Sequence, residues 1–283
     1  MTQGSGTLFI VSTPIGNLAD ISQRAVETLN SVDIIAAEDT RRTGQLLSHF
    51  GINKKQIALH DHNEEKKVPK IIESITDGQK IALVSDAGTP LINDPGFDLV
   101  RAALDANLNV VPVPGPCSPI VALSVSGLPT DRFIYEGFLP AKQGARIKHL
   151  ESLVKEPRTL VFLESSHRIV SSLTDMLTVF GADRTAVIAR ELTKTFETIK
   201  KAPIKELVEW IEADANQTKG EFVVVVDGSK VESSGKSELE AETIVKALLE
   251  EGIGVKQTSV IAAKLTGKKK KELYSLALEL SEK

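Results

Sequence analysis

The chain has little that would support disulfide, zinc or membrane chemistry. Its single cysteine, Cys117, excludes an intramolecular disulfide and any zinc site built from several cysteines. No apolar run approaches the roughly 20 residues that a membrane helix needs, and the amino terminus lacks a signal-peptide pattern. We therefore expect a cytoplasmic protein with no membrane partner and no bound metal.

Aromatic residues and net positive charge are also scarce. Aromatics make up 4% of the 283 residues, so few side chains are available to stack on bases. Lysine and arginine number 34 against 38 aspartates and glutamates, a formal charge of −4. Nothing in the overall charge indicates a nucleic-acid partner, although local basic clusters could still bind phosphates.

Apolar runs that alternate with helical patterns predict an α/β fold with two α/β domains. In the first domain, expected at residues 1–116, strands are predicted at Thr7–Val11, Asp33–Ala37, Ile81–Val84 and Val110–Val113. Asp20 and Gln23 have the spacing of a capping box at the start of the first helix.

A second α/β domain is expected at residues 117–228, with strands at Phe133–Phe138, Thr159–Leu163, Ala186–Ala189, Phe196–Ile199 and Phe222–Val226. Residues 229–283 are expected to form a polar linker, which includes VESSGKSELE, and a small helical module. Apolar positions there predict three helices, on faces formed by Ile244, Ala247 and Leu248, by Val260, Ile261 and Leu265, and by Leu273, Leu276, Ala277 and Leu280.

Three loops rich in glycine, proline and small residues follow predicted strands: Ser12–Asn17, Ser85–Pro95 and Pro114–Pro119. Because ligands of open α/β sheets bind at the carboxyl ends of strands, we expect these loops and Asp86 to meet at one sheet edge around a polar, nucleoside-like ligand. The alternative is that they are tight turns only. The first loop has too few glycines for a dinucleotide fingerprint, and no P-loop motif is present.

Other polar segments offer both chemical and structural interpretations. In AAEDTRRT, Arg41 and Arg42 could contact phosphate or could simply pair with Glu38 and Asp39. His60 and His62 in LHDHNE have a spacing compatible with metal ligands but lack further partners, which favours a solvated loop. Cys117 lacks the context of a catalytic cysteine and Ser118 that of a hydrolase nucleophile.

Several segments together resemble the tetrapyrrole-methylase-like superfamily and, within it, the ribosomal RNA small subunit methyltransferase I family. They are STPIGNLAD, AAEDTRRT, VSDAGTPLINDPG, VPVPGPCSPI, FLESSHRI, ARELTKTFE and KGEFVVVV. The resemblance spans about residues 8–228, and the last module is similar to the helix-turn-helix extension of many members. It implies two α/β domains of tetrapyrrole-methylase type that enclose a cofactor cleft, with a small C-terminal helical module, and a homodimer.

The resemblance further implies that S-adenosylmethionine is the cofactor and that the reaction is 2′-O-methylation of a cytidine ribose in the decoding region of 16S rRNA, in the small ribosomal subunit. The positions that match the family's cofactor loops are Pro14, Ile15, Gly16, Asp86, Gly88, Thr89, Cys117 and Ser118, with Leu163 and the strand after Gly220–Glu221 as wall positions. Where tetrapyrrole-modifying members have a glycine-rich GxGxGD-like run, this chain has TPIGNLAD, which disfavours a tetrapyrrole substrate.

A ribose hydroxyl is a poor nucleophile, so a base within hydrogen-bond reach would assist the transfer. Candidates for this role are Glu38, Asp39, His60 and His167. We expect phosphate contacts from Arg41, Arg42, Arg168, Arg190, Lys268, Lys269, Lys270 and Lys271, with a solvated loop as the alternative for the lysines. The competing functions are a small-molecule, tetrapyrrole-type methyltransferase and a noncatalytic RNA-binding or ribosome assembly factor.

Overall fold

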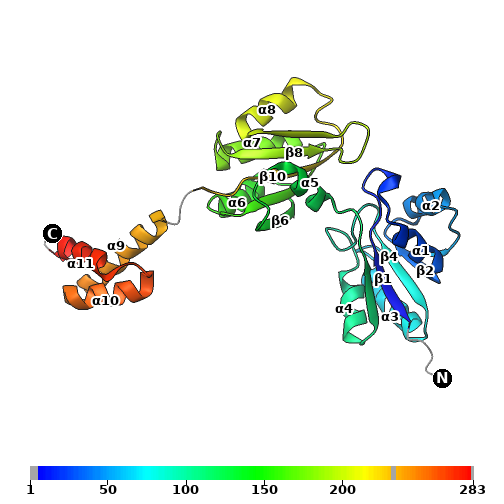
Figure 1. Ribbon diagram of the computed structural model, residues 1–283, viewed down its shortest axis with the longest axis horizontal. Coiled ribbons are helices and arrows are strands. Elements are labelled where there is room, and N and C mark those ends of the chain that lie inside the picture. Colours follow the sequence, from blue (N-terminus) through cyan, green and yellow to red (C-terminus); the bar gives the residue numbers. More distant parts are fainter. Residues whose placement is uncertain (1–5, 231–233, 282–283) are drawn as a thin grey trace. The chain divides into compact units, whose positions relative to one another are not determined.

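The computed structural model, shown in Figure 1, describes residues 6–230 and 234–281. Its contacts divide the chain into two units. The larger contains the residues up to 154 together with 158–227, and the smaller contains 155–157 and the residues from 228 onward. Within the described residues, no helix has both the length and the apolar character that a membrane span requires.

The first sheet consists of five parallel strands in the order β3-β2-β4-β1-β5. The strands are β1 (Thr7–Val11), β2 (Ile34–Ala37), β3 (Lys55–Ala58), β4 (Lys80–Val84) and β5 (Asn109–Val113). The helices are α1 (Gln23–Ser31), α2 (Thr40–His49), α3 (Glu64–Thr76) and α4 (Phe97–Asp105), with a short 3-10 helix at Leu18–Asp20.

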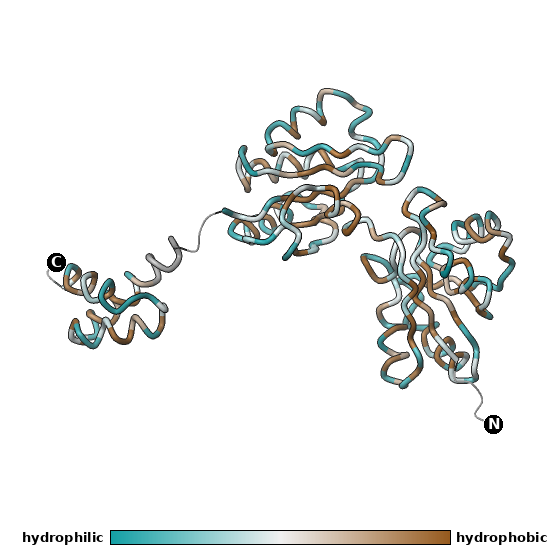
Figure 2. Tube along the Cα trace, viewed as in Figure 1, coloured by the Kyte–Doolittle hydropathy of each residue, from teal (hydrophilic) through white to brown (hydrophobic). Residues whose placement is uncertain are grey.

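Both faces of this sheet are buried, which explains why its strands read as continuous apolar runs. In β4, Ile81 and Leu83 join the core formed with α3 and α4, whereas Ala82 and Val84 join the core formed with α1 and α2. Figure 2 shows the hydrophobic residues concentrated along the strands. The four strands predicted from the sequence are confirmed to within one residue at each end.

Two local features differ from the sequence prediction. The cap of α1 is Ser22, whose Oγ accepts a hydrogen bond from the amide of Ala25 at 3.1 Å, so the capping box at Asp20 is wrong. Asp20 instead ends the 3-10 helix. The edge strand β3 was not predicted, because Lys55–Ala58 has neither an alternating nor a continuous apolar pattern.

The second sheet has the order β6-β7-β10-β8-β9, with β6 and β7 parallel and the other neighbours antiparallel. Its strands are β6 (Phe133–Phe138), β7 (Thr159–Ser165), β8 (Thr185–Arg190), β9 (Thr198–Pro203) and β10 (Glu221–Val226). Its helices are α5 (Ser118–Ser126), α6 (Gln143–Leu153), α7 (Ile169–Phe180) and α8 (Ile204–Ala213).

Helices α6, α7 and α8 cover one face of this sheet, and α5 covers the other. Ile15, from the loop after β1, packs into the α5 face with Val223 and Leu192, so the two sheets share a core there. The strand predicted at Phe196–Ile199 is shifted: β9 starts at Thr198, and Phe196 lies 71% exposed in the preceding loop. The sequence of β9, TIKKAP, is that of a polar edge strand and contains no apolar run from which the strand could be predicted.

The described residues of the smaller unit form the helices α9 (Ser234–Glu250), α10 (Val255–Thr266) and α11 (Lys270–Ser281). They pack around Ala241, Val245, Ala262, Leu273 and Ala277. The linker prediction for VESSGKSELE is wrong from Ser234 onward, where α9 begins; residues 231–233 lie outside the described residues.

The third predicted helical face in this unit is confirmed, but the first two are only partly correct. Ala247 is exposed, and Leu265 is 66% exposed. In α10 the buried positions include Thr258 and Ser259, whose hydroxyls bond to backbone carbonyls within the same unit. Hydropathy alone therefore selected the wrong stripe of this helix.

Candidate functional site

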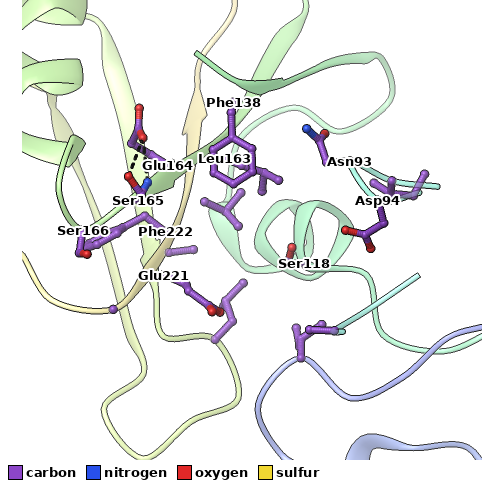
Figure 3. Close-up of a pocket in the computed structure, with 17 residues that line it drawn as sticks. Asn93, Asp94, Ser118, Phe138, Leu163, Glu164, Ser165, Ser166, Glu221 and Phe222 are labelled. Atoms are coloured by element: carbon purple, nitrogen blue, oxygen red, sulfur yellow. Dashed lines mark hydrogen bonds between the residues drawn. The ribbon is translucent and has the colours of Figure 1, made fainter. Parts of the chain in front are cut away.

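A cavity of about 380 Å³ lies within the larger unit, bordered by residues from both sheets (Figure 3). The volume is within the range of small-ligand pockets. Ile15 and Ala87 come from the loops after β1 and β4 at the carboxyl edge of the first sheet, and Ser118 begins α5 directly after the loop that follows β5. Leu163 and Val223 come from the central strands of the second sheet.

Hydrogen bonds hold the three loops together, as the sequence analysis predicted. The Thr89 hydroxyl lies 2.9 Å from the Ser12 hydroxyl and donates to the carbonyl of Pro116 at 2.9 Å. Thr13 and Gly88 form an isolated antiparallel bridge. These contacts arise because β4, β1 and β5 are parallel neighbours, so the loops that follow them emerge side by side.

The loop after β4 is anchored to the second sheet by Asn93. Asn93 has a left-handed backbone, with φ at 67°, and its Oδ1 accepts a hydrogen bond from the hydroxyl of Tyr135 in β6. Burial raises the pKa of Tyr135 to about 12, so the hydroxyl remains a donor. Gly137 permits this close approach, because a Cβ there would lie 2.8 Å from Asn93 Oδ1.

Carboxylates and arginines meet at the ends of β2 and β4, beside these loops. Asp86 Oδ1 accepts from the amide of Asp39 at 3.0 Å, and Glu38 Oε2 accepts from the amide of Asp86 at 3.2 Å. Arg42 pairs with Asp86 at 3.2 Å, and Arg41 pairs with Asp39 at 2.6 Å. The sequence therefore placed these residues together correctly. Of the ion pairs that it offered as the structural alternative, Arg41 with Asp39 is present, whereas Arg42 pairs with Asp86 and not with Glu38 or Asp39.

The four candidate bases differ in their surroundings. Hydrogen bonds from Arg41 hold the pKa of Asp39 far below its usual range, which makes Asp39 a weak base. Burial raises the pKa of Glu38. His60 Nε2 lies 2.9 Å from the side-chain amide of Asn63, and its buried Nδ1 has no hydrogen-bond partner. His167 is exposed in the turn after β7.

None of these four side chains borders the cavity. Within the described residues, no group of three or more histidines, cysteines or carboxylates could hold a metal ion.

The residues matched to cofactor loops fall into two groups. Ile15, Ser118 and Leu163 border the cavity directly. The others lie in the loops that form or brace its walls: Pro14, Gly16, Asp86, Gly88, Thr89 and Cys117. Cys117 is the N-cap residue of α5 and makes no side-chain capping bond.

The arginines that were expected to contact phosphate differ in their exposure and in their partners. Arg41 and Arg42 expose 87% and 67% of their side chains. Arg168 pairs with the buried Glu164 at 2.9 Å, and its guanidinium lies 5.9 Å from the centre of the Phe138 ring. Arg190 is buried and donates to the carbonyls of Lys219 and Asn216, so we do not retain it as an RNA contact.

The lysine run belongs to the smaller unit. Lys268 and Lys269 lie between α10 and α11, and Lys270 and Lys271 begin α11. Lys269, Lys270 and Lys271 are exposed.

Sequence reasoning missed Asp94 and Phe138, which both border the cavity. The pKa of Asp94 is raised to about 6, chiefly by burial and in smaller part by the carboxylates of Glu38, Asp86 and Asp61, against a hydrogen bond from Ser85 that lowers it. Asp94 was within a segment already singled out, but Asp94-Pro95-Gly96 has the composition of an ordinary turn. Phe138 ends a predicted strand and carries no sequence signal for its 50% exposure.

Replacing Asp94 with asparagine should stabilise the protein at alkaline pH. A folded pKa above the ordinary value of 3.8 means that protonation of Asp94 favours the folded state. This contribution is complete below pH 3.8 and is lost as the pH rises through about 6. We expect D94N to raise the free energy of unfolding by about 1–2 kcal/mol at pH 8, after allowance for solvent screening, and by little at pH 4.

Urea unfolding at pH 4, 6 and 8 measures this difference. D105N, at the exposed end of α4, is the matched control and should unfold as the wild type does at all three values. A constant difference between D94N and wild type across this range would contradict a raised pKa at Asp94.

The chain matches two known protein families. Residues 7–208 match the family described as Tetrapyrrole (Corrin/Porphyrin) Methylases, and residues 236–281 match the RsmI C-terminal HTH domain. Ribosomal RNA small subunit methyltransferase I of Escherichia coli O157:H7 is 54% identical over 97% of this chain and 95% of its own. The protein of the same name from Haemophilus influenzae is 53% identical over 100% of both chains.

Solved structures with the same fold are far more distant in sequence. Uroporphyrin-III-C-methyltransferase from Thermus thermophilus has a TM-score of 0.53 at 18% identity and covers 82% of this chain and 98% of its own. Cobalt precorrin-4 methyltransferase has a TM-score of 0.57 at 16% identity, over 78% and 94%. These likenesses confirm the predicted fold class. From the sequence matches, the chain belongs to the tetrapyrrole methylase family and, within it, to the ribosomal RNA small subunit methyltransferase I family.

Proposed function

We propose that this protein transfers a methyl group from S-adenosylmethionine to the 2′-hydroxyl of a cytidine ribose in the decoding region of 16S rRNA. The observation that carries the proposal is the near full-length identity of 45–54% to proteins named ribosomal RNA small subunit methyltransferase I. That similarity includes the C-terminal module as well as the two sheets.

S-adenosylmethionine is the methyl donor of this family. When bound, it supplies an electrophilic methyl group on a positively charged sulfur. The residues of the cavity suit its parts: Ile15, Leu163 and Val223 offer apolar walls for an adenine ring. Ser118 and the backbone at Gly220 offer polar groups for a ribose or amino acid.

The features around Phe138 suit a nucleobase. Its ring borders the cavity and is half exposed, while the Arg168 guanidinium lies over the ring. RNA is read in single strands mainly by stacking of bases on aromatic rings, so we assign Phe138 as the platform for the target cytosine. A ring held by a neighbouring guanidinium keeps its orientation when the base binds.

Phosphate contacts would come from Arg41 and Arg42 on the larger unit and from Lys268–Lys271 on the smaller one. Reversing the charge of all four lysines is expected to weaken binding to small ribosomal subunits at least tenfold and to reduce the salt dependence of that binding. Affinity for S-adenosylmethionine should stay within about twofold, because the lysines and the cavity lie in different units.

The measurement is subunit binding at several salt concentrations, beside cofactor titration calorimetry. K205E, a charge reversal at an exposed lysine of α8, is the control. An equal loss of cofactor and subunit affinity would refute the phosphate-binding assignment of the run.

The direct test of the proposed function is transfer of labelled methyl to isolated small subunits that lack the modification, mapped to the nucleotide. Free rRNA and a tetrapyrrole precursor serve as parallel acceptors. We expect ribose label at a single cytidine of the decoding region. Label on the tetrapyrrole alone, or no transfer despite cofactor binding, would contradict the proposal.

The proposal also includes a homodimer that acts in the cytoplasm, where its ribosomal substrate is found. Helix α5 supports a subunit contact because Ile120 and Val125 remain 51% and 49% exposed on it. Light scattering of the purified chain tests this part of the proposal.

A further inference from the structure

Three carboxylates border the cavity, and two of them are already neutralised. Glu164 is buried, pairs with Arg168 at 2.9 Å and accepts from the Ser172 hydroxyl at 2.6 Å. Glu221 pairs with Lys194 at 3.0 Å. The third, Asp94, accepts a hydrogen bond from the Ser85 side chain, and the charges that act most strongly on it are acidic: Glu38, Asp86 and Asp61.

The carboxylate of Asp94 is aimed at the cavity. Figure 3 shows it extending toward the space above Ser118, on the side opposite Leu163 and Phe222. Ser118 and Leu163, which border that space, are residues that we assign to contacts with the methyl donor. Asp94 is thus placed to contact a molecule held in the cavity.

The backbone holds Asp94 in place from both directions. On one side, Asn93 is fixed by Tyr135 and by the close approach of Gly137. On the other, the buried Glu64 accepts from the amides of Gly96 and Leu99 at 3.2 and 3.0 Å. Left-handed backbone at Leu91 and Asn93 is costly for side-chain-bearing residues, and such strain is concentrated at functional sites.

We propose that Asp94 is the general base of the methyl transfer, accepting the proton of the ribose 2′-hydroxyl. This assignment rests on the function proposed above. As the proton passes to the carboxylate, an electron pair of the oxygen forms the new bond to the methyl carbon. The carbon–sulfur bond breaks and its electrons neutralise the sulfonium, after which Asp94 returns the proton to water.

The raised pKa of Asp94 agrees with this role. A carboxylate with a pKa near 6 is a stronger base than an ordinary aspartate and is still ionised at neutral pH. Among the other candidates, Asp39 is too weak a base, and Glu38, His60 and His167 do not border the cavity.

The test compares D94N, D94E and D105N with wild type in single-turnover methylation of unmodified small subunits across pH 5 to 9. Cofactor affinity is measured by calorimetry, and the titration of the Asp94 carboxyl carbon is followed by NMR. We expect D94N to slow methyl transfer by about 10²- to 10⁴-fold with cofactor affinity nearly unchanged. D94E should retain more activity, and D105N should match wild type.

Two readouts separate this role from a structural one. In wild type, the rate should rise with pH through about 6, together with the NMR titration of Asp94, and D94N should lose that rise. D94N should also be at least as stable as wild type at pH 8, which excludes misfolding as the cause.

Wild-type rates in D94N, or a parallel loss of cofactor affinity, would overturn the base assignment while wild type still labels the cytidine. If wild type labels no ribose, the proposed function fails, and the base assignment fails with it.

Discussion

Replacing Arg146 with methionine is expected to lower the free energy of unfolding by about 3–5 kcal/mol. Arg146 in α6 and Asp175 in α7 are each 4% exposed, and their atoms Nε and Oδ2 lie 2.7 Å apart. The guanidinium also donates to the carbonyls of Pro140 and Ala141. R146M would leave a buried carboxylate whose remaining partner is the side-chain amide of Gln143.

A double variant tests whether the loss comes from the unpaired charge. R146M/D175L removes both charges and should recover most of the stability, because an apolar pair of similar size can replace a buried ion pair. R101M breaks an exposed pair with Asp98 and should cost less than about 1 kcal/mol. Urea unfolding of all four proteins measures these differences, and equal losses in R146M and R101M would contradict the argument.

Replacing Gly220 with alanine is expected to weaken S-adenosylmethionine binding by about 10- to 100-fold. Gly220 borders the cavity and has φ at 101°, and a Cβ there would lie 2.5 Å from the Glu191 side chain. Glu191 cannot move freely, because its Oε1 accepts from the Glu221 amide at 2.9 Å and from Lys194 at 3.0 Å. Displacing it would break both bonds and disturb this wall of the cavity. The expected 10- to 100-fold loss of affinity corresponds to about 1.4–2.8 kcal/mol of binding free energy.

Gly181 provides the matched control for this substitution. It has φ at 91°, ends α7 and has open space where a Cβ would be placed. G181A therefore carries the same kind of backbone strain, of order 1 kcal/mol, without touching the cavity. Calorimetric titration with the cofactor should separate the two variants, and an equal affinity in G220A and G181A would show that the Glu191 contact does not shape the site.

Sequence patterns located most of the elements that form the walls of the site. The run at Thr7–Val11 was identified to the residue as β1, because a strand buried on both faces is apolar throughout. Hydrophobic patterns did not locate elements that bury only one face or little of their surface. Edge strands β3 and β9 carry polar residues, so neither was placed correctly. Helix α10 buries Thr258 and Ser259, so its packed face could not be found from hydropathy.

Candidate site residues divide in the same way. Ile15 and Ser118 were found because Ile15 lies in the loop after β1 and Ser118 comes directly after the loop that follows β5, and both of these loops must emerge at the carboxyl edge of the parallel sheet. Arg190 was expected to contact RNA, but folding encloses its guanidinium among the carbonyls of a loop 26 to 29 residues further along the chain. No local pattern distinguishes an arginine that faces solvent from one that is satisfied internally.

The sequence by itself determined the α/β class and the meeting of three loops at one edge of the first sheet, because these depend on local apolar runs and on turn-forming residues along the chain. Its motifs also indicated the family, and that resemblance implied the methyl donor. Only the tertiary structure decided which of the carboxylates that border the cavity has no compensating cation among the residues that the structure describes. Asp94 owes its position to Tyr135 and Gly137 of the second sheet and its raised pKa to burial there. Burial and the balance of neighbouring charges depend on segments far apart in sequence, and they exist only once the two sheets have packed.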